Sequence, residues 1–300
     1  MTQPNLFDRT LLKQKRTTAL ASAKPGSDFL MEVVAEDMAD RLMALSRTFG
    51  TGIDFGGHTG RIADVMRKSG KIGTVLRADL FCSDPNLPPP DLVFDDATPP
   101  FRDQSVEMIV SALSLHWVND LPGSLVQIRR ALKPDGLFLG VLLGGDTLYE
   151  LRDVLMRAEL EIAGGAAPRV SPFADIRDLG ALLQRAGFAL PVTDTDRLTV
   201  RYSSMFALLQ DLKAMGATSV LTERSRKPLA RAVLMRAAEL YLQDYSDPDG
   251  RIRATYALVS LSGWAPHESQ QKPLRPGSAK IRLADALGAK EMPLTPTGKD

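Results

Sequence analysis

A glycine-rich turn between a buried strand and a helix is the most restrictive feature of this sequence. The stretch GIDFGGHTGRIADVM, residues 52–66, starts as a short apolar strand and continues into a helix that Gly70 ends. A strand that leads through such a turn into a helix is the first unit of many nucleotide-binding α/β domains. The chain is therefore expected to fold around a parallel sheet, with a ligand near this turn.

Further strand and helix patterns in the first half support this expectation. The run VEMIVSALSLHW is almost continuously apolar, which is typical of a parallel strand buried on both faces. Strands are expected within residues 51–57, 71–80, 91–101, 106–117 and 137–145, with a helix over 121–132 and a turn at KPDG, 133–136. This alternation predicts a doubly wound sheet, whose ligands bind at the carboxyl ends of the strands.

Helices dominate the second half. Thr147 and Glu150 have the spacing of a capping box, and the segment 171–188 predicts a helix with Ser171 as its N-cap and Gly187 just beyond its end. Helical spacing recurs in 205–212 and 230–241, and strands are expected within 188–202 and 254–264, the latter closing the sheet.

Composition excludes several classes of protein. With 37 basic and 36 acidic residues, the chain lacks the excess of positive charge that nucleic-acid binding requires. The single cysteine, Cys82, excludes an internal disulfide and fits a reducing compartment. One cysteine and three histidines (His58, His116 and His267) are too few for a Cys/His zinc cage, so no metal site is predicted. No apolar run approaches the roughly 20 residues of a membrane span.

Three kinds of ligand site compete for the turn. A P-loop requires a lysine after its last glycine, but Arg61 follows Gly60; a dinucleotide site requires G-x-G-x-x-G, which is absent. The pattern D-x-G-x-G-x-G of S-adenosylmethionine (SAM) sites is matched by Asp54, Gly56 and Gly60, with Gly57 between them, and is missed at His58. Glycine backbone can approach a ligand closely because it has no Cβ.

Two more acidic residues at predicted strand ends favour SAM. Asp79 ends the second strand, where a carboxylate can accept hydrogen bonds from both ribose hydroxyls. Asp95 follows the third strand, where it can accept from the adenine amino group. Their neighbours Leu80 and Asp96, and Ser111 on the fourth strand, complete the predicted cofactor-binding set.

These motifs resemble those of the class I SAM-dependent methyltransferase superfamily. The segments GIDFGGHTG, RADL, DDATPPF and ALKPDGLFLG carry the resemblance over residues 47–145. It implies a mostly parallel seven-stranded sheet, with a helical N-terminal arm and helical insertions in the C-terminal half. We divide the chain into that arm (1–45), the SAM-binding core (46–145), a substrate- or partner-facing part (146–285) and a flexible tail (286–300).

A narrower resemblance covers residues 6–287. The segments HWVNDLP, GGDTLYELR, SPFADIRDLGALLQRAGF and GWAPHESQQKPLRPGSA are similar to respiratory complex I assembly factors of methyltransferase fold. The family is described as an arginine hydroxylase that acts on an iron–sulfur subunit of complex I. The resemblance implies this subunit as the partner. It also implies a cytoplasmic location in a bacterium, or the matrix side of the inner membrane in a mitochondrion, with no integral membrane segment and peripheral association left open.

Hydroxylation raises a chemical difficulty, because it needs an oxidant and usually a metal or flavin. A non-haem iron site would need two histidines and a carboxylate, and the sequence does not show that His116 and His267 meet. We take His116 and Asp146 as catalytic candidates. The structural alternatives are a polar end to the fourth strand for His116 and helix capping for Asp146.

Two other functions stay open. One is an ordinary SAM-dependent methyltransferase, similar to the malonyl-carrier-protein enzyme of early biotin synthesis. The other is a non-catalytic assembly chaperone that keeps SAM as a structural ligand. His58 is expected to take a left-handed backbone conformation at a cost of about 1–3 kcal/mol, so that His58→Gly would tighten SAM binding.

Overall fold

The computed structural model describes residues 5–23, 26–80, 88–271, 278 and 281–288. The chain forms two units, Met1–Pro266 and His267–Asp300. The first contains the sheet and the second contains the short helix α9 (Leu283–Leu287). Cys82 and residues 289–300 of the predicted tail lie outside the described residues, and the domain boundaries at 45, 145 and 285 stay predictions.

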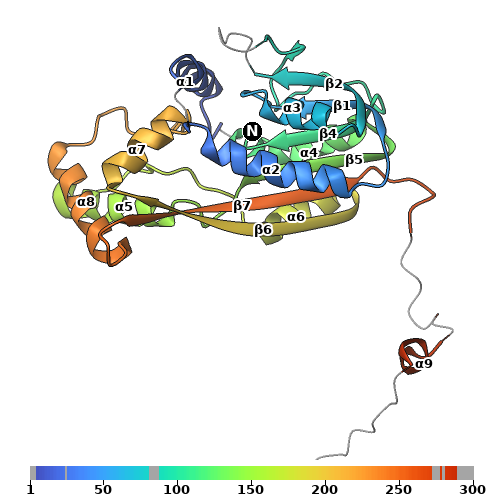
Figure 1. Cartoon of the computed structure of the whole chain (residues 1–300). Coiled ribbons are helices and arrows are strands. Elements are labelled where there is room, and N and C mark those ends of the chain that lie inside the picture. The colour runs from blue at the N-terminus through green and yellow to red at the C-terminus, as the bar shows by residue number, and fades with distance from the viewer. Residues whose placement is uncertain (1–4, 24–25, 81–87, 272–277, 279–280, 289–300) are drawn as a thin grey trace, which may run out of the picture. The chain divides into compact units, whose positions relative to one another are not determined.

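The described part of the chain contains one seven-stranded sheet of the predicted doubly wound type (Figure 1). The strands run in the order β3-β2-β1-β4-β5-β7-β6. They are β1 (Phe49–Phe55), β2 (Ile72–Asp79), β3 (Leu92–Val93), β4 (Val106–Ala112), β5 (Leu132–Leu143), β6 (Ala189–Tyr202) and β7 (Ile252–Trp264). β1 to β5 pair in parallel, whereas β7 is antiparallel to β5 and β6. The strand order reverses between β1 and β4, which is where such sheets bind ligands.

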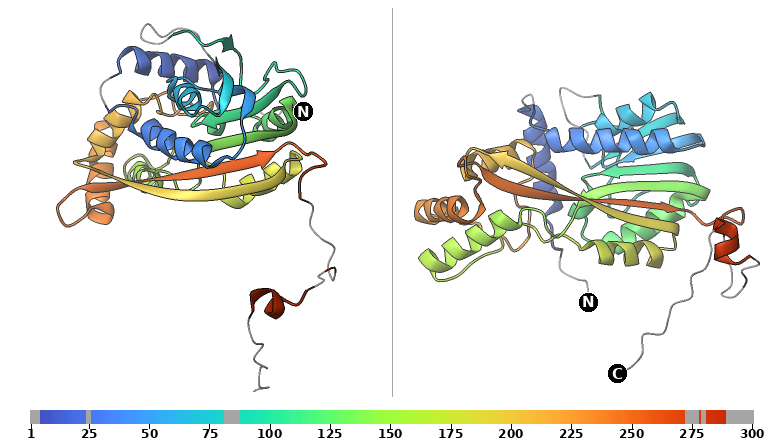
Figure 2. Two further views of the ribbon diagram at one scale, coloured as in Figure 1. Left: turned by 45° about the vertical axis from the view of Figure 1, so that its right-hand side comes forward. Right: turned by 60° about the horizontal axis from the view of Figure 1, so that its bottom comes forward.

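Helices cover both faces of the sheet, as the two views of Figure 2 show. One face is covered by α2 (Phe29–Ala44) and α3 (Arg61–Lys68), and the other by α4 (Leu121–Ala131) and α6 (Ile176–Arg185). Buried apolar side chains from opposite sides of the strands form two separate cores, one around Met38 and Met108 and one around Phe55 and Leu125.

β6 and β7 continue beyond the parallel strands as a long antiparallel pair (Figure 1). The helices α5 (Tyr149–Ala163), α7 (Met205–Ala214) and α8 (Arg231–Tyr245) pack near this extension. Tyr241 and Tyr256 are fully buried there. The buried side chains of these helices therefore extend the core around Met38 and Met108.

The predicted helical arm is present as α1 (Arg9–Ala21) and is docked. Its first turn is capped by Asp8, whose carboxylate accepts from the Leu11 N–H at 2.9 Å. The preceding Phe7 packs against Trp117 and Leu221 in a small separate core, which fixes the start of the arm to loops that lie far away in sequence.

Two local predictions are wrong. The KPDG segment lies within β5, where Asp135 and Gly136 exchange backbone hydrogen bonds with Ala265, although the register of β5 against β4 shifts there and Asp135 has a positive φ of 61°. The helix expected from Ser171 begins at Ile176, because Asp175 supplies the cap by accepting from the Arg177 N–H.

The capping box predicted for Thr147 and Glu150 at the start of α5 is also wrong. α5 begins at Tyr149 without a side-chain cap. The hydroxyl of Thr147 accepts from the Ala257 N–H, and the carboxylate of Glu150 accepts from the backbone and hydroxyl of Thr255. Both side chains therefore anchor the start of α5 to β7.

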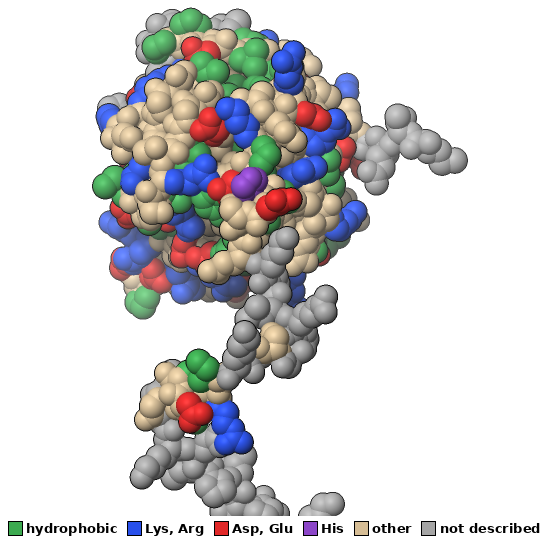
Figure 3. Space-filling view, turned by 90° about the vertical axis from the view of Figure 1, so that its right-hand side faces the viewer, with side chains coloured by type: hydrophobic (Ala, Val, Ile, Leu, Met, Phe, Trp, Pro, Cys, Tyr) green, Lys and Arg blue, Asp and Glu red, His purple; other side chains and the backbone are tan. Residues whose placement is uncertain are grey.

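Acidic and basic side chains are interspersed on the face shown in Figure 3, in keeping with their nearly equal numbers. None of the helices in the described residues has the length and apolar character of a bilayer-spanning segment.

Candidate cofactor and active site

The glycine turn places its strain at glycines and not at His58. Gly56 and Gly60 have φ values of +79° and +74°, whereas His58 is absent from the residues with positive φ. The His58 N–H donates to the Gly56 carbonyl at 2.9 Å, which closes the turn. The expectation of a strained histidine is therefore wrong, because the two left-handed positions lie on either side of it.

Gly56 and Gly57 make room for side chains of the protein itself. A Cβ on Gly57 would collide with the carboxylate of Asp54, and a Cβ on Gly56 would collide with the hydroxyl of Ser114. Asp54 is fully buried, and its carboxylate accepts from the Ala63 N–H in the first turn of α3. Asp54 thus holds the turn against the helix, a role that the motif alone does not reveal.

The acidic residues at the strand ends lie together, as predicted. Asp79 ends β2, and Asp95 and Asp96 follow β3; Asp79 and Asp96 are buried, whereas the Asp95 side chain is 40% exposed. One carboxylate oxygen of Asp54 and one of Asp79 are buried without a hydrogen-bond partner. Burial raises the pKa of Asp54 to about 7 and that of Asp79 to about 6.

Two arginines of α1 lie near these acids, and the sequence analysis identified neither of them. The guanidinium of Arg9 pairs with Asp95 and Asp96, and it donates to the Trp117 carbonyl at 2.9 Å. Arg16 is 4% exposed and donates to the Leu113 carbonyl at 2.9 Å, and burial lowers its pKa to about 10. The sequence did contain a signal for this pair, because Arg9 and Arg16 are seven residues apart and such residues lie on one face of a helix.

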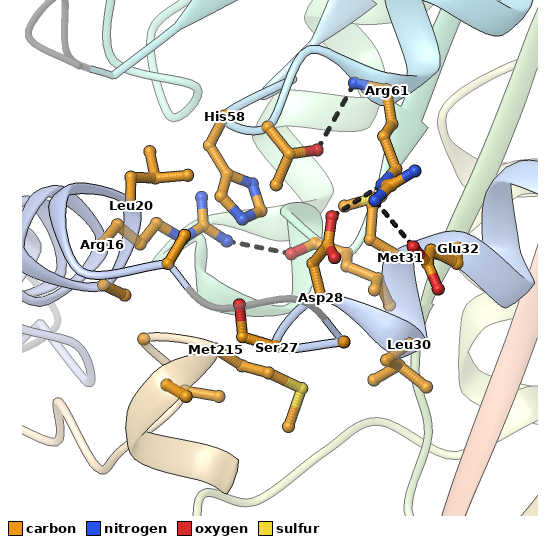
Figure 4. Close-up of a pocket in the computed structure, with 18 of the residues that line it drawn as sticks. Arg16, Leu20, Ser27, Asp28, Leu30, Met31, Glu32, His58, Arg61 and Met215 are labelled. Carbon is orange, nitrogen blue, oxygen red and sulfur yellow. Dashed lines mark hydrogen bonds and ion pairs between the residues drawn. The ribbon is translucent and has the colours of Figure 1, made fainter. Parts of the chain in front are cut away.

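A cavity of about 520 Å³ opens beside the turn (Figure 4). α1 contributes Arg16 and Leu20, and the start of α2 lies opposite, with Asp28 and Met31 among the labelled side chains. The other lining residues include His58, Thr59, Arg61, Leu113, His116, Trp117, Leu143, Met215 and Gly216. The pocket therefore combines the glycine turn, the ends of β4 and β5, the arm and the segment after α7.

His116 and His58 line this pocket as neutral side chains. His116 follows β4 and packs against Trp117 and Phe173, and its Nδ1 is 3.5 Å from the Leu143 N–H. Burial, with the charge of Arg16 next, lowers the pKa of His116 to about 3. The pKa of His58 is held well below its ordinary value by the same two causes. The pocket thus holds a single buried cation, Arg16, among its described lining residues.

Asp146 is not among the residues that line the pocket. Its carboxylate pairs with Arg197 on β6, and its side chain is 55% exposed. Its catalytic role stays a prediction. Asp146 lies exposed at the surface, whereas His116 is buried and lines the pocket.

Ser111 and Leu80 have packing roles in this structure. The hydroxyl of Ser111 donates to the Phe55 carbonyl and joins β4 to β1, while Leu80 packs against the core around Phe7 and Trp117. Their cofactor contacts stay predictions. In the described residues, no group of three or more His, Cys, Asp or Glu side chains is arranged to hold a metal ion.

Comparison with known proteins identifies the family. Residues 29–191 match the model of a methyltransferase domain. The human protein named mitochondrial arginine-hydroxylase NDUFAF5 is 40% identical over 302 residues, which cover 98% of this chain and 86% of the human one. The chain belongs to the NDUFAF5 family.

Two less similar proteins also match this chain. A malonyl-[acyl-carrier protein] O-methyltransferase of Laribacter hongkongensis is 32% identical, with 83% of this chain and 86% of that one covered. The YcgJ protein of Bacillus subtilis has a similar fold, with a TM-score of 0.52 at 14% identity over 78% of this chain and 98% of that one. This member of the NDUFAF5 family is thus an enzyme of the SAM-dependent methyltransferase superfamily, as predicted.

Proposed function

We propose that the chain binds SAM at the carboxyl ends of β1, β2 and β4 and hydroxylates an arginine of an iron–sulfur subunit of respiratory complex I during assembly. The observation that carries this proposal is the 40% identity over nearly the whole chain to a protein named as an arginine hydroxylase. The proposal includes a cytoplasmic location in a bacterium or the matrix side of the inner membrane in a mitochondrion.

The acids at the strand ends fit the adenosine part of SAM. The free oxygen of Asp79 is a buried acceptor that lacks a donor, and the two ribose hydroxyls would supply donors. Asp95 is the more exposed acid after β3, so its carboxylate remains accessible to the adenine amino group. The bound cofactor would supply an electrophilic methyl group on a sulfonium.

Arg9 and Arg16 have different relations to this ligand. Arg9 pairs with the same acids that the adenosine would use, so it has to give up that pairing when the ligand binds. Arg16 lies in the pocket, where its cation fits the carboxylate at the amino-acid end of SAM. The two arginines therefore lie at opposite ends of the proposed ligand.

Around the two histidines the pocket is lined by apolar side chains, while another part of its wall carries the ion pairs of Arg61 with Asp28 and Glu32. Since Nδ1 of His116 accepts from Leu143, the ring proton lies on Nε2. Neutral rings add no charge to a pocket that already holds Arg16, and Trp117 and Met215 help to exclude water from it.

The competing activity is methyl transfer. It is supported by the 32% identity to the Laribacter O-methyltransferase, and the same pocket could orient a nucleophile toward SAM. Proximity and orientation are the main requirements for that reaction.

A deletion strain distinguishes these functions. We expect the deletion to lower complex I activity and to remove one oxygen from an arginine-containing peptide of the iron–sulfur subunit, as measured by mass spectrometry. Wild-type chain should restore both, Asp79→Ala should restore neither, and the exposed control Asp103→Ala should restore both. Loss of a methyl group would support the methyltransferase. Lost complex I activity without any mass change would support a chaperone.

A further inference from the structure

The pocket beside the glycine turn has walls of opposite charge (Figure 4). On one side lies the buried cation Arg16 of α1, and the neighbouring Lys15 holds this helix in place by donating to the Ser219 carbonyl at 2.7 Å. On the other side lie Asp28 and Glu32 at the start of α2, and they are the only carboxylates among the described residues that line the pocket. A positively charged ligand group is therefore attracted to the α2 side and repelled by Arg16.

The two carboxylates already hold one guanidinium of the chain itself. Nε of Arg61 donates to Oδ2 of Asp28 at 2.6 Å, and Nη2 donates to Oε1 of Glu32 at 2.7 Å. No other described residue pairs with either acid, and their side chains are 31% and 45% exposed, so each has a second oxygen open to a ligand. Because two acids face one cation, the group keeps an excess of one negative charge.

Helix capping does not explain the acid at the start of α2. Asp28 is the N-cap residue of this helix, where an aspartate normally accepts from a backbone N–H of the first turn. Here its side chain makes no such bond and pairs with Arg61 instead. Glu32 follows four residues later, on the same side of the helix. Both carboxylates are therefore presented to the pocket.

The pocket also contains a polar atom that lacks a partner. Nδ1 of His58 is buried without a hydrogen-bond partner in the described part of the chain. Buried polar atoms of this kind are usually satisfied by a ligand or by ordered water. A guanidinium carries five N–H donors in a planar fork that matches carboxylate oxygens, so it suits the α2 wall better than a neutral group does.

We propose that Asp28 and Glu32 bind the guanidinium of the target arginine through their second oxygens, while Arg61 holds both carboxylates in position. This inference rests on the proposed function, which makes arginine the target. The incoming guanidinium balances the excess negative charge of the group. A target that carries a carboxylate is repelled by the same wall, so the two acids determine specificity.

Nuclear magnetic resonance of the purified full-length chain, saturated with S-adenosylhomocysteine, tests this arginine site. The probe is Nα-acetyl-arginine methylamide, its neutral counterpart is the citrulline compound of the same length, and the ring signals of His58 and His116 report binding. We expect the arginine compound to bind about tenfold more tightly, because its hydrogen bonds are charge-assisted, with a smaller difference at high salt. Equal binding of the two compounds would overturn the proposal.

Three variants distinguish an arginine site from a structural clamp between α2 and α3. Asp28→Asn should bind the arginine compound about tenfold more weakly. Asp37→Asn, which removes an acid of similar exposure that pairs with Arg41 on α2, should bind it like the wild type. Arg61→Gln should bind it about threefold more tightly, because a competing cation is gone.

A structural clamp would weaken binding in both Asp28→Asn and Arg61→Gln, and that result would contradict the proposal. Loss of S-adenosylhomocysteine binding in Asp28→Asn would also contradict it, because the acid would then contact the ammonium group of the cofactor. Binding does not depend on the reaction, so a methyl group lost in the deletion strain would overturn the hydroxylase and leave the arginine site in place. Equal binding of both compounds, with an oxygen still added in the cell, would overturn the arginine site alone.

Discussion

The guanidinium of Arg9 pairs with the carboxylate of Asp96, and this ion pair ties the N-terminal helix to the strand end where the adenosine of SAM is expected. Both side chains are largely buried, at 13% and 6% exposure. The arm and the proposed ligand therefore compete for the same acids.

This competition predicts a gain of affinity on removal of Arg9. Arg9→Ala should tighten SAM binding by about tenfold, because the ligand no longer has to displace a buried cation and a tenfold change needs only about 1.4 kcal/mol. Isothermal calorimetry measures the effect, with Arg41→Ala as a control that removes a surface pair within α2. Weaker binding by Arg9→Ala would instead make Arg9 a ligand contact.

Arg16 should act in the opposite direction. Arg16→Gln removes the buried cation of the pocket, and we expect SAM binding to weaken by at least tenfold, since charge-assisted hydrogen bonds to a carboxylate contribute about 1.5–3 kcal/mol. Adenosine, which lacks the carboxylate, should bind the variant and the wild type alike. Equal losses for both ligands would contradict the assignment.

Gly57→Ala tests the packing of the turn. The new methyl group would collide with the Asp54 carboxylate, so we expect a loss of about 1–3 kcal/mol in the free energy of unfolding. Gly165→Ala is the control, because nothing lies within 4 Å of a Cβ at that position. Urea denaturation compares the two, and equal stabilities would show that Asp54 can move away.

The raised pKa of Asp79 predicts a pH-dependent difference between variants. The folded chain holds the proton of Asp79 up to a pKa of about 6, against an ordinary 3.8, so between these values it binds more protons than the unfolded chain. This carboxylate therefore costs stability as pH rises through that window. Relative to wild type, ligand-free Asp79→Asn should gain stability from pH 4 to 6, by up to about 3 kcal/mol, as urea denaturation at each pH would measure.

His116 should remain neutral wherever the enzyme is active. Its pKa of about 3 predicts that its ring signals do not titrate between about pH 5 and 8. Nuclear magnetic resonance of the imidazole nitrogens would detect this. A titration midpoint near 6.5 would show that the ring is exposed to water.

The sheet and the acids at its strand ends could be predicted because both depend on local patterns. Apolar runs mark buried strands, and Asp79 and Asp95 come directly after them. The backbone conformation of His58 could not be predicted from spacing alone, because a glycine motif does not say which of its positions is left-handed. Asp175 replaced Ser171 as a cap because several residues near a helix start can supply one.

The contacts that the arm makes could not be predicted from the sequence and became known only from the structure. Arg9 and Arg16 share a helix face, but nothing local says what that face meets. Their positions depend on Val220 and Leu221, which hold the arm from about two hundred residues later in sequence. Contacts between residues so far apart in sequence depend on how the whole core packs, so a short motif cannot predict them.

The bond from Lys15 to the Ser219 carbonyl also bears on synthesis of the chain. Ribosomes release the arm first and the segment after α7 much later, so the nascent chain can complete β1 to β5 before its pocket has a second wall. Until Ser219 emerges, the arm is held only by its contacts with the first half of the chain, among them the ion pair of Arg9 with Asp96. The pocket wall formed by the segment after α7 is therefore the last part of the candidate site to be synthesised.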